Sequence, residues 1–324
     1  MTVGPDGNIY LSLGGQNRVV MLPDRNRDGQ ADEVITVADR LNAPQGLAFV
    51  DDKLLVANQD GVVRLINGRP QTFIPRLPSG GHTMKSLKLG PDGFLYLNVG
   101  SSCNVCAETD PARATIQRYT RDGKPAGKNG AIWATGLRNT QGFAWQPGTK
   151  VMYATNNGAD MRASRKNGQP DDNIPPEHLN RIEGGANYGW PYCWGNKEID
   201  PNFTGAAGAC KNMQTPAFML PAHSTPIGMT FVDTTTFPDE YQGDALVALH
   251  GSWNRATPAG YKVVRVKFSN GNPVDVSDFA TGWLDDHTAW GRPVDVMFGP
   301  DGALYISDDR AGIVFRIIHR GVRK

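Results

Sequence analysis

Histidine and arginine side chains placed just before apolar segments are the strongest candidates for chemistry in this sequence. His82 follows a glycine pair in GGHTMKSLKLGPDG, and the ordinary pKa of histidine, near neutrality, suits abstraction of a hydroxyl proton. Arg138 takes the same position in GLRNTQGFAWQP. Its permanent charge and planar donors suit a carboxylate or negative charge developing on a carbonyl oxygen. Two plain interpretations stay open: a loop histidine bonded to the backbone, and an arginine in an ion pair between repeat units.

Further polar residues occupy equivalent positions beside other apolar segments. Gln45 precedes one in APQGLAF, Asn139 follows the arginine named above, and Arg292 precedes another in AWGRPVDVMFGPDG. His223, in PAHSTPIGMTF, and His250, in HGSWNR, flank two more. If the segments are strands around one axis, these side chains face a common mouth. They then predict a site for an anionic ligand that forms many hydrogen bonds.

Two other stretches offer oxygen atoms to a hard cation. In NNGAD, the backbone carbonyl groups of Gly158 and Ala159 could bind Ca²⁺. A loop near the N-terminus follows calcium-loop spacing, with oxygen donors at its first, third, fifth and ninth positions and glycine at the sixth. Ile35 stands at the twelfth position, where such loops carry glutamate, so a structural Ca²⁺ and a plain aspartate-rich turn are both open. The loop's oxygen donors are Asp24, Asn26, Asp28 and Asp32.

A repeated hairpin pattern must position these residues. GPDGNIYLSLG, GPDGFLYLNVG and GPDGALYISDD are near copies, each with a tight turn and a second strand rich in apolar residues. Weaker copies are AFVDDKLLVAN, AWQPGTKVMYAT and the segment 230–249, and most copies continue into a third strand such as GVVRLI or GIVFRI. Six units of roughly 40–60 residues fit the blades of a propeller. We therefore predict an all-β, six-bladed β-propeller in which residues 1–324 form a single domain.

The spacing of the units also predicts a long insert, approximately 161–221, between the fourth and fifth blades. Its aromatic residues and cysteines favour an ordered segment. The C-terminal segment supplies three strands, whereas the N-terminal segment begins at the first strand of its own blade. We expect either a three-stranded last blade or a chain shortened at its N-terminus.

Composition narrows the class of protein. The net charge of +1, with no Lys/Arg cluster, argues against nucleic-acid binding. No apolar run reaches the roughly 18–20 residues of a membrane span. The cysteines form two close pairs, Cys103/Cys106 and Cys193/Cys210, whose spacing fits two local disulfides of an exported protein better than a zinc site. We therefore expect a periplasmic or secreted protein, and because the chain begins MTVGPDG we expect a mature or trimmed form.

Longer motifs resemble those of the pyrroloquinoline-quinone (PQQ) sugar dehydrogenases, in particular the L-sorbosone and aldose dehydrogenase-like branch. They are spread over essentially the whole chain and are specific together: HTMKSLKLGPDGFLYLNVGSSCNVC, GLRNTQGFAWQP, LNRIEGGANYGWPYC, PAHSTPIGMTF, ALHGSWNR and GRPVDVMFGPDGALYISDD. The resemblance implies a six-bladed propeller that binds PQQ and Ca²⁺ at the mouth of its central channel.

The resemblance also implies roles for single residues. His82 matches the base that takes the proton of the sugar C1 hydroxyl while hydride passes to the quinone, and Arg138 matches the arginine that stabilises charge on the quinone oxygen. Arg292 matches an arginine that pairs with PQQ carboxylates. The turn at Gly158 and Ala159 matches the one whose carbonyl groups hold the catalytic Ca²⁺. The remaining cofactor-facing candidates are Asn139, Gln141, Gln45 by position, and Arg255 or His250, which stand where the glucose-oxidising branch has a lysine.

These residues predict a PQQ- and Ca²⁺-dependent oxidoreductase that oxidises a sugar or sugar aldehyde at the anomeric carbon. Electrons would pass to an external acceptor, a cytochrome or a quinone. Two other classes stay open. A Ca²⁺-dependent lactonase-type propeller would use carboxylates and asparagine around a metal, whereas a site rich in arginine and histidine favours an anionic cofactor. A non-catalytic propeller that binds glycans or peptides would need neither a base nor a cofactor.

Overall fold

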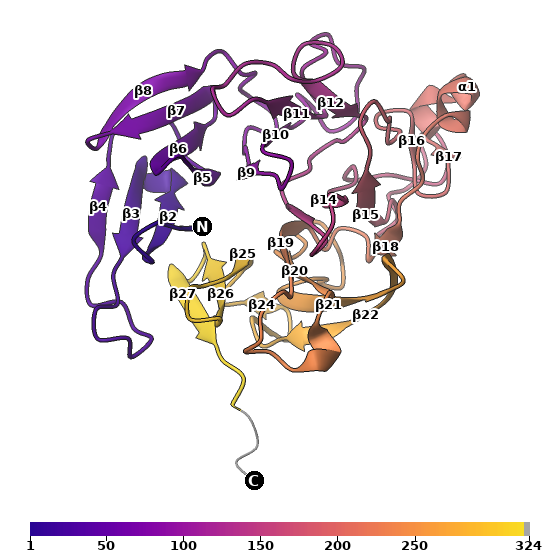
Figure 1. The fold of residues 1–324 in the computed structure, drawn as a ribbon. Coiled ribbons are helices and arrows are strands. Elements are labelled where there is room, and N and C mark those ends of the chain that lie inside the picture. The colour runs from indigo at the N-terminus through magenta and orange to yellow at the C-terminus, as the bar shows by residue number, and fades with distance from the viewer. Residues whose placement is uncertain (321–324) are drawn as a thin grey trace. The chain divides into compact units, whose positions relative to one another are not determined.

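The computed structural model describes residues 1–320, and its secondary structure is almost entirely β-strand (Figure 1). The chain falls into two compact units: unit 1 comprises Met1–Asn139 and Glu183–Ala186, and unit 2 comprises Thr140–Ile182 and 187–320. No helix of the described residues is long and apolar enough to cross a membrane. Their helical elements are the 3₁₀ turns η1 (Gly14–Gln16), η2 (Pro201–Phe203) and η3 (Asp239–Tyr241) and the short helix α1 (Ala207–Lys211).

Unit 1 contains three four-stranded antiparallel sheets whose strands lie side by side in chain order. The first consists of β1 (Thr2–Val3), β2 (Ile9–Leu13), β3 (Arg18–Leu22) and β4 (Ile35–Ala38). The second consists of β5 (Leu47–Val50), β6 (Lys53–Asn58), β7 (Gly61–Ile66) and β8 (Arg69–Ile74). The third consists of β9 (Leu87–Leu89), β10 (Leu95–Val99), β11 (Thr115–Tyr119) and β12 (Ile132–Thr135).

Unit 2 contains three further antiparallel sheets, whose strands also lie side by side in chain order. The fourth consists of β13 (Phe143–Trp145), β14 (Met152–Asn156), β15 (Glu177–Ile182) and β18 (Phe218–Leu220), and the fifth of β19 (Pro226–Phe231), β20 (Ala245–Leu249), β21 (Lys262–Ser269) and β22 (Asn272–Ala280). The last has three strands, β25 (Pro293–Phe298), β26 (Leu304–Asp308) and β27 (Ile313–Ile317). Two short hairpins complete the unit, β16 (Cys193–Trp194) with β17 (Glu198–Ile199) and β23 (Leu284–Asp285) with β24 (Thr288–Ala289).

These six sheets confirm the prediction of an all-β, six-bladed β-propeller. The last blade is three-stranded, which agrees with one of the two expectations for the ends of the chain. The third strands expected from GVVRLI and GIVFRI are β7 and β27. That residues 1–324 form a single domain stays a prediction.

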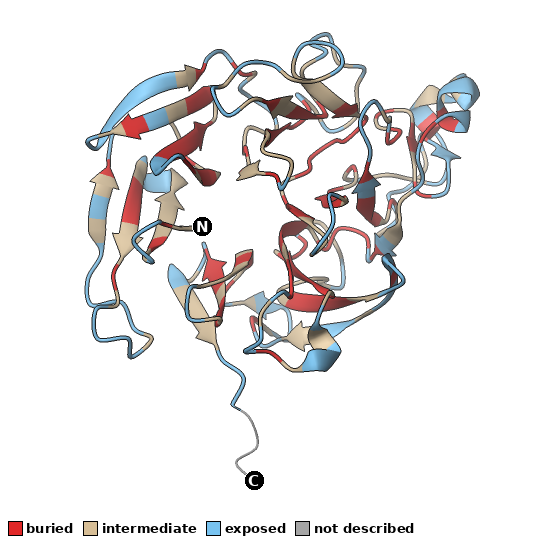
Figure 2. Ribbon diagram, in the orientation of Figure 1, coloured by how far each residue is buried: buried red, intermediate tan, exposed pale blue. Residues whose placement is uncertain are grey.

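Burial explains why the second strand of a blade is so apolar. All residues of β10 (LYLNV), β14 (MYATN) and β20 (ALVAL) are buried (Figure 2). A strand covered on both faces requires a nearly continuous apolar run, and full burial of a Leu or Val side chain stabilises the fold by about 1.5–3 kcal/mol. The fourth strand β8 (RPQTFI), at the edge of its sheet, exposes its first four residues and is polar. In the second blade, the strands therefore change from buried and apolar at β6 to exposed and polar at β8.

The GPDG turns share one hydrogen-bonding scheme. In the first copy, the amide of Gly7 donates to Gly4 O at 2.9 Å, and Gly7 has a left-handed φ of +77°, which favours glycine. The Asp6 carboxylate accepts hydrogen bonds from the Asn8 amide at 3.1 Å and from Tyr10 Oη at 2.9 Å. Burial works against the charge of Asp6, but these bonds outweigh it and hold the pKa of that carboxyl below its ordinary value. The same tyrosine-to-aspartate bond recurs in the copies at Tyr96–Asp92 and Tyr305–Asp301.

The range 161–221, expected to be one insert between the fourth and fifth blades, lies within the fourth blade instead. Both β15 and β18 fall within that range, and they pair with each other as the third and fourth strands of the fourth blade. The long excursions are therefore two, 157–176 before β15 and 183–217 before β18, and both interrupt the fourth blade. The sequence did not mark β15 as a strand, because EHLNRI mixes charged and apolar residues without simple alternation.

His178, on β15, is a buried neutral histidine. Its Nε2 accepts a hydrogen bond from the Gly195 amide at 3.1 Å, and burial lowers the pKa of His178 to about 4. The unfolded chain binds the proton near the ordinary pKa of 6.5, so between these values the unfolded state carries more protons than the folded state. The stability that neutral His178 contributes is therefore fully present above about pH 6.5 and decreases as the pH falls towards 4. The loss amounts to about 3 kcal/mol, at about 1.4 kcal/mol per pKa unit.

We expect His178→Phe to remove this acid-dependent component. The variant loses the bond to Gly195 and is less stable at pH 7, but its free energy of unfolding changes less between pH 6.5 and 4 than that of the wild type. Urea unfolding at several pH values measures both curves. His287→Phe, at an exposed histidine, is the matched control and should follow the wild-type slope. Parallel curves for His178→Phe and wild type would show that His178 titrates normally.

Candidate functional site

In unit 1, the predicted base His82 rests against the end of β10. Its backbone amide donates to Ser101 O at 2.9 Å, and its ring Nδ1 lies 2.8 Å from Ser101 Oγ and 3.2 Å from Ser101 O. Gly100 allows this approach, because a Cβ at that position would lie 2.6 Å from His82 Cβ and from His82 O. The imidazole is therefore held by Ser101 on its Nδ1 side.

Arg138, the predicted charge stabiliser, is tied to the same loop. It is only 3% exposed, and its guanidinium donates from Nε to Asn104 O at 3.0 Å and from Nη2 to Asn104 Oδ1 at 2.8 Å. The backbone carbonyl of Arg138 accepts a hydrogen bond from the Ser101 amide at 2.8 Å. Because Ser101 also contacts His82, the structure brings these two predicted residues to one loop, 101–108.

Lys85 is a buried cation three residues after His82. Its Nζ donates to Gln59 O at 2.7 Å, Pro78 O at 2.8 Å and Thr83 O at 3.1 Å, so all three ammonium protons have carbonyl partners. Burial lowers the pKa of Lys85 to about 8, with a smaller contribution from the nearby Arg113. Lys85 thereby closes the loop that carries His82, at both Pro78 and Thr83.

The other two candidates of unit 1 are Gln45 and Asn139. Gln45 is half-buried, with its backbone bonded to Ala57 O at 2.8 Å and to Ser12 Oγ at 2.5 Å. The next residue, Gly46, donates its amide to Lys85 O at 2.8 Å, so the segments before β5 and β9 lie together, as the shared pre-strand position predicts. Asn139 is 6% exposed at the end of unit 1.

In unit 2, the predicted Ca²⁺ turn at Gly158 and Ala159 follows β14 and is braced by a buried carboxylate. Glu177 is 2% exposed, and its Oε2 accepts a hydrogen bond from the Gly158 amide at 2.5 Å. Its Oε1 accepts from the Thr225 amide at 3.2 Å, which ties the turn to the segment before β19. Glu177 therefore fixes the backbone on which the predicted carbonyl ligands lie.

We expect Glu177→Gln to loosen this turn. An amide side chain has a single acceptor oxygen, so one of the two backbone amides loses its partner, which costs about 1–3 kcal/mol. Chemical unfolding measures that loss, and Ca²⁺ titration should show weaker binding than in the wild type. Glu198→Gln, at an exposed glutamate of the same unit, serves as control. Equal Ca²⁺ affinity and stability in both variants would contradict the bracing role.

Oxygen atoms gather beside the same turn. Asp160 Oδ1 accepts a hydrogen bond from Asn254 Nδ2 at 3.0 Å and lies 3.9 Å from His223 Nδ1. Burial lowers the pKa of His223, and the charge of Asp160 offsets part of that effect. Asn254 Oδ1 is buried and accepts no hydrogen bond from residues 1–320. The donor set is therefore rich in oxygen, which is the chemistry that Ca²⁺ prefers.

Arg292 and His250 are joined through backbone carbonyls. The Arg292 guanidinium donates from Nε to His250 O at 3.0 Å and from Nη2 to Gly251 O. His250 Nε2 lies 3.0 Å from Asp309 Oδ1, and this bond, with the charge of His250, outweighs burial and holds the pKa of Asp309 below its ordinary value. The structure thus brings two of the predicted cofactor contacts together in unit 2.

Arg255, the third candidate of this segment, is anchored in the same manner. Its Nε donates to Thr257 O at 3.1 Å and its Nη1 to Ala222 O at 2.9 Å. Among residues 1–320, neither Arg255 nor Arg292 forms an ion pair with a carboxylate, and each guanidinium uses two of its five N–H donors on carbonyl groups. The remaining donors suit the carboxylates of an anionic ligand. Gln141, also in unit 2, is half-buried.

The loop at 24–32 forms its own hydrogen bonds. Asp24 accepts from the amides of Asp28 and Gly29 at 3.1 and 2.9 Å, and Asn26 Oδ1 accepts from the Asp28 amide at 3.0 Å. Asp32 Oδ2 accepts from the Arg25 amide at 2.8 Å. These are the bonds of an aspartate-rich turn, which was one of the two interpretations. A structural Ca²⁺ at this loop stays a prediction.

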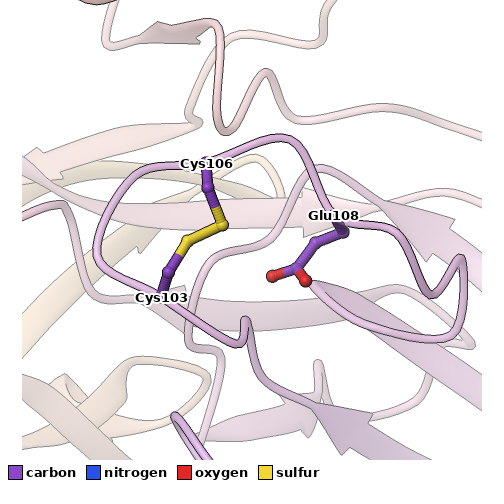
Figure 3. Close-up of side chains that lie close together, drawn as sticks. All are labelled: Cys103, Cys106 and Glu108. Atoms are coloured by element: carbon purple, nitrogen blue, oxygen red, sulfur yellow. A yellow bond between two sulfur atoms is a disulfide. The ribbon is translucent and has the colours of Figure 1, made fainter.

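Both predicted disulfides are present. Cys103 pairs with Cys106, and Cys193 pairs with Cys210. Figure 3 shows the Glu108 carboxylate beside the first pair, and the ligand atoms of Cys103, Cys106 and Glu108 all lie within 4.8 Å of one another. Because both sulfur atoms are bonded to each other, they offer no thiolate to a metal. The disulfide interpretation is confirmed over zinc.

Three residues that hold the predicted site residues in place were not predicted from the sequence: Ser101, Asn104 and Glu177. The first two stand in SSCNVC, where the cysteines suggested only a disulfide. Glu177 stands in PPEHL, in the stretch interpreted as an insert. Neither stretch carries a spacing that points to His82, Arg138 or Gly158, because these contacts join residues 19 to 34 positions apart.

The chain is similar over most of its length to known proteins. An uncharacterized protein of Borreliella burgdorferi is 26% identical over 99% of this chain and 86% of its own length. A pyrroloquinoline quinone-dependent pyranose dehydrogenase of Coprinopsis cinerea is 29% identical over 68% of this chain, which spans only 37% of that protein. The solved holo form of the PQQ domain of the C. cinerea pyranose dehydrogenase, 22% identical, has a TM-score of 0.81 and matches 98% of this chain and 91% of that chain. This likeness shows the same fold.

The family model described as TrAA12-like matches residues 52–320, which include the loop of His82 and Arg138, the braced turn at Gly158, and Arg292. Because this match covers most of the chain, the protein belongs to the TrAA12-like family.

Proposed function

We propose that this protein is a PQQ- and Ca²⁺-dependent oxidoreductase that oxidises a sugar or sugar aldehyde at the anomeric carbon. The observation that carries the proposal is the pair of anchored guanidinium groups, Arg255 and Arg292, which keep donors beyond those bonded to carbonyl groups and form no ion pair within residues 1–320. PQQ has three carboxylates, and two fixed cations match them. The similarity to a PQQ-dependent pyranose dehydrogenase points the same way.

Bound PQQ would supply a quinone that takes up two electrons as hydride, and Ca²⁺ would supply a Lewis acid that polarises it. The residues of this chain would supply the base and stabilise the developing charge. His82 accepts the proton of the sugar C1 hydroxyl, since a neutral imidazole is a suitable base near pH 7. Arg138 stabilises negative charge that develops on oxygen.

The remaining candidates bind and orient the two groups. In this proposal the backbone carbonyls of Gly158 and Ala159 hold Ca²⁺, and Glu177 keeps their backbone in place. Arg292 and Arg255 bind carboxylates of the cofactor. The other contacts that we propose for the cofactor are those of Gln45, Asn139, Gln141 and His250.

Electrons would leave to a separate acceptor, a cytochrome or a quinone. The proposed location is the periplasm or the outside of the cell, because the two disulfides fit an oxidising compartment. In the same proposal, residues 1–324 act as one propeller domain.

Reconstitution tests the function. PQQ and Ca²⁺ are added to the purified protein, and dye reduction is followed across a panel of aldoses and sugar aldehydes. We expect reduction that requires both additions, together with thermal stabilisation by PQQ. Neither a spectral change nor stabilisation would reject the proposal, and lactone hydrolysis and glycan binding would then be measured.

A further inference from the structure

We propose that the loop closed by the Cys103–Cys106 disulfide is a positioning segment that sets the tautomer of His82 and the orientation of Arg138. The proposal rests on the function assigned above to these two residues. The disulfide loop, as the term is used below, comprises residues 101–108. It lies entirely within unit 1, as do His82 and Arg138, the two residues that it positions.

The hydrogen bonds of Ser101 select one tautomer of His82. Ser101 Oγ lies 2.8 Å from Cys103 O, a carbonyl that can only accept, so the single hydroxyl proton serves that bond. Ser101 Oγ can then only accept from His82 Nδ1, also at 2.8 Å. The second neighbour of Nδ1, Ser101 O at 3.2 Å, is again only an acceptor. Both bonds form together when Nδ1 carries the proton, which leaves the lone pair of neutral His82 on Nε2, the nitrogen that can act as base.

The same loop orients Arg138 through one residue. Asn104 accepts with both its backbone O and its Oδ1 from adjacent donors of the guanidinium, a two-point contact that fixes the plane of the group. Asn104 lies between the two bonded cysteines, so the disulfide ring restricts its backbone. Although Asn104 is exposed, Arg138 is 3% exposed.

A second clamp closes the loop outside the disulfide. The Glu108 carboxylate accepts from the Ser102 amide at 2.6 Å and from Ser102 Oγ at 2.7 Å, and Figure 3 shows it next to the sulfur atoms. Three contributors therefore lie within four residues of one another, on or next to this doubly closed segment: Ser101 for His82, Cys103 for the Ser101 proton and Asn104 for Arg138. Opening the segment would disturb the predicted base and the predicted charge stabiliser together.

The first experiment reads the tautomer without any turnover. Protein labelled with ¹³C and ¹⁵N in histidine is examined by NMR, in which ring carbon and nitrogen shifts distinguish Nδ1–H from Nε2–H. We expect the wild type to show the Nδ1–H form of His82. Ser101→Ala and the double variant Cys103→Ser/Cys106→Ser should both add the Nε2–H form. Cys193→Ser/Cys210→Ser, which opens the disulfide of unit 2, is the control and should leave the His82 signals unchanged.

The second experiment uses the reconstituted holoprotein. A shift of about 1 Å in a reacting group can cost about 100-fold in rate, so we expect the Cys103/Cys106 double variant to lose about 10- to 100-fold in kcat, with KM changed less. Asn104→Ala should lower kcat but keep the wild-type tautomer, and Asn104→Asp, which retains the side-chain acceptor, should recover much of the loss. Asn129→Ala, at another exposed loop asparagine of unit 1, should match the wild type.

The two readouts separate the possible failures. If wild-type holoprotein reduces no dye with any sugar while Ser101→Ala mixes the tautomers, the proposed function is wrong and the positioning of His82 stands. If Ser101→Ala and the Cys103/Cys106 double variant keep the pure Nδ1–H form and a kcat within about twofold of the wild type, the positioning role is overturned. Ser101→Ala keeps the test decisive even if the double variant does not fold.

Discussion

Replacing His82 by alanine is expected to lower kcat for sugar oxidation by about 10²- to 10⁴-fold, the range typical for removal of a general base. The variant has no imidazole to accept the proton, and Ser101 Oγ, which donates its own proton to Cys103 O, is not a base that could replace it. Steady-state dye reduction with reconstituted protein measures the loss. The predicted cofactor contacts Arg255 and Arg292 are untouched, so thermal stabilisation by PQQ and Ca²⁺ should persist.

That persistence distinguishes a lost base from a lost cofactor site. His287→Ala, at a histidine with a 62% exposed side chain, is the matched control and should retain wild-type kcat. If His82→Ala keeps activity within a few-fold, His82 is the loop histidine of the plain interpretation. If it loses both activity and PQQ stabilisation, His82 contributes to binding, and the role of base passes to another group.

Replacing Arg265 by alanine is expected to lower the free energy of unfolding by about 3–5 kcal/mol, the range for removing one partner of a buried ion pair. Arg265 Nε donates to Asp244 Oδ2 at 2.6 Å, and the two side chains are 11% and 7% exposed. The guanidinium also donates to Glu240 O and lies 3.9 Å from the centre of the Tyr241 ring. Without it, Asp244 keeps a buried charge, and its remaining hydrogen-bond donor within residues 1–320 is the Phe268 amide, at 2.7 Å.

Urea unfolding measures the effect of Arg265→Ala. The control is Arg121→Ala, because Arg121 pairs with Asp51 on the surface and such pairs contribute about 0–1 kcal/mol. A double-mutant cycle with Asp244→Asn should show coupling, since neutralising Asp244 removes the unpaired charge. A loss below about 1 kcal/mol for Arg265→Ala would mean that water reaches Asp244 and that the pair is not buried in solution.

Most of the fold could be predicted from the sequence because its determinants are local. Each GPDG turn closes through contacts at most four residues apart, such as Asp92 with Tyr96, and the apolar run after that turn is long enough to identify a buried strand. The fourth blade was harder. Its strands β14 and β15 are separated by 157–176, and β15 and β18 by 183–217, so their pairing depends on contacts that no short window contains.

The predicted site residues follow the same division. His82, Arg138 and Arg292 could be predicted from their residue types and their positions before a strand, because the sequence shows both features directly. The residues that hold them in place cannot be recognised in this way, because Ser101 lies 19 residues from His82 and Asn104 lies 34 residues from Arg138. Hydrogen bonds between separate loops need exact distances, and sequence spacing does not encode those distances.

The sequence by itself therefore determined the β-propeller class, the two disulfide pairs and the residue types capable of acting as base and cation. These follow from period-two apolar patterns, turn residues and cysteine spacing, each of which acts over a few residues. The tertiary structure alone decided that one disulfide loop serves both His82 and Arg138, and that Glu177 braces the turn at Gly158. The physical reason is that a buried donor or acceptor must find a partner wherever the packed chain places one, near or far in sequence.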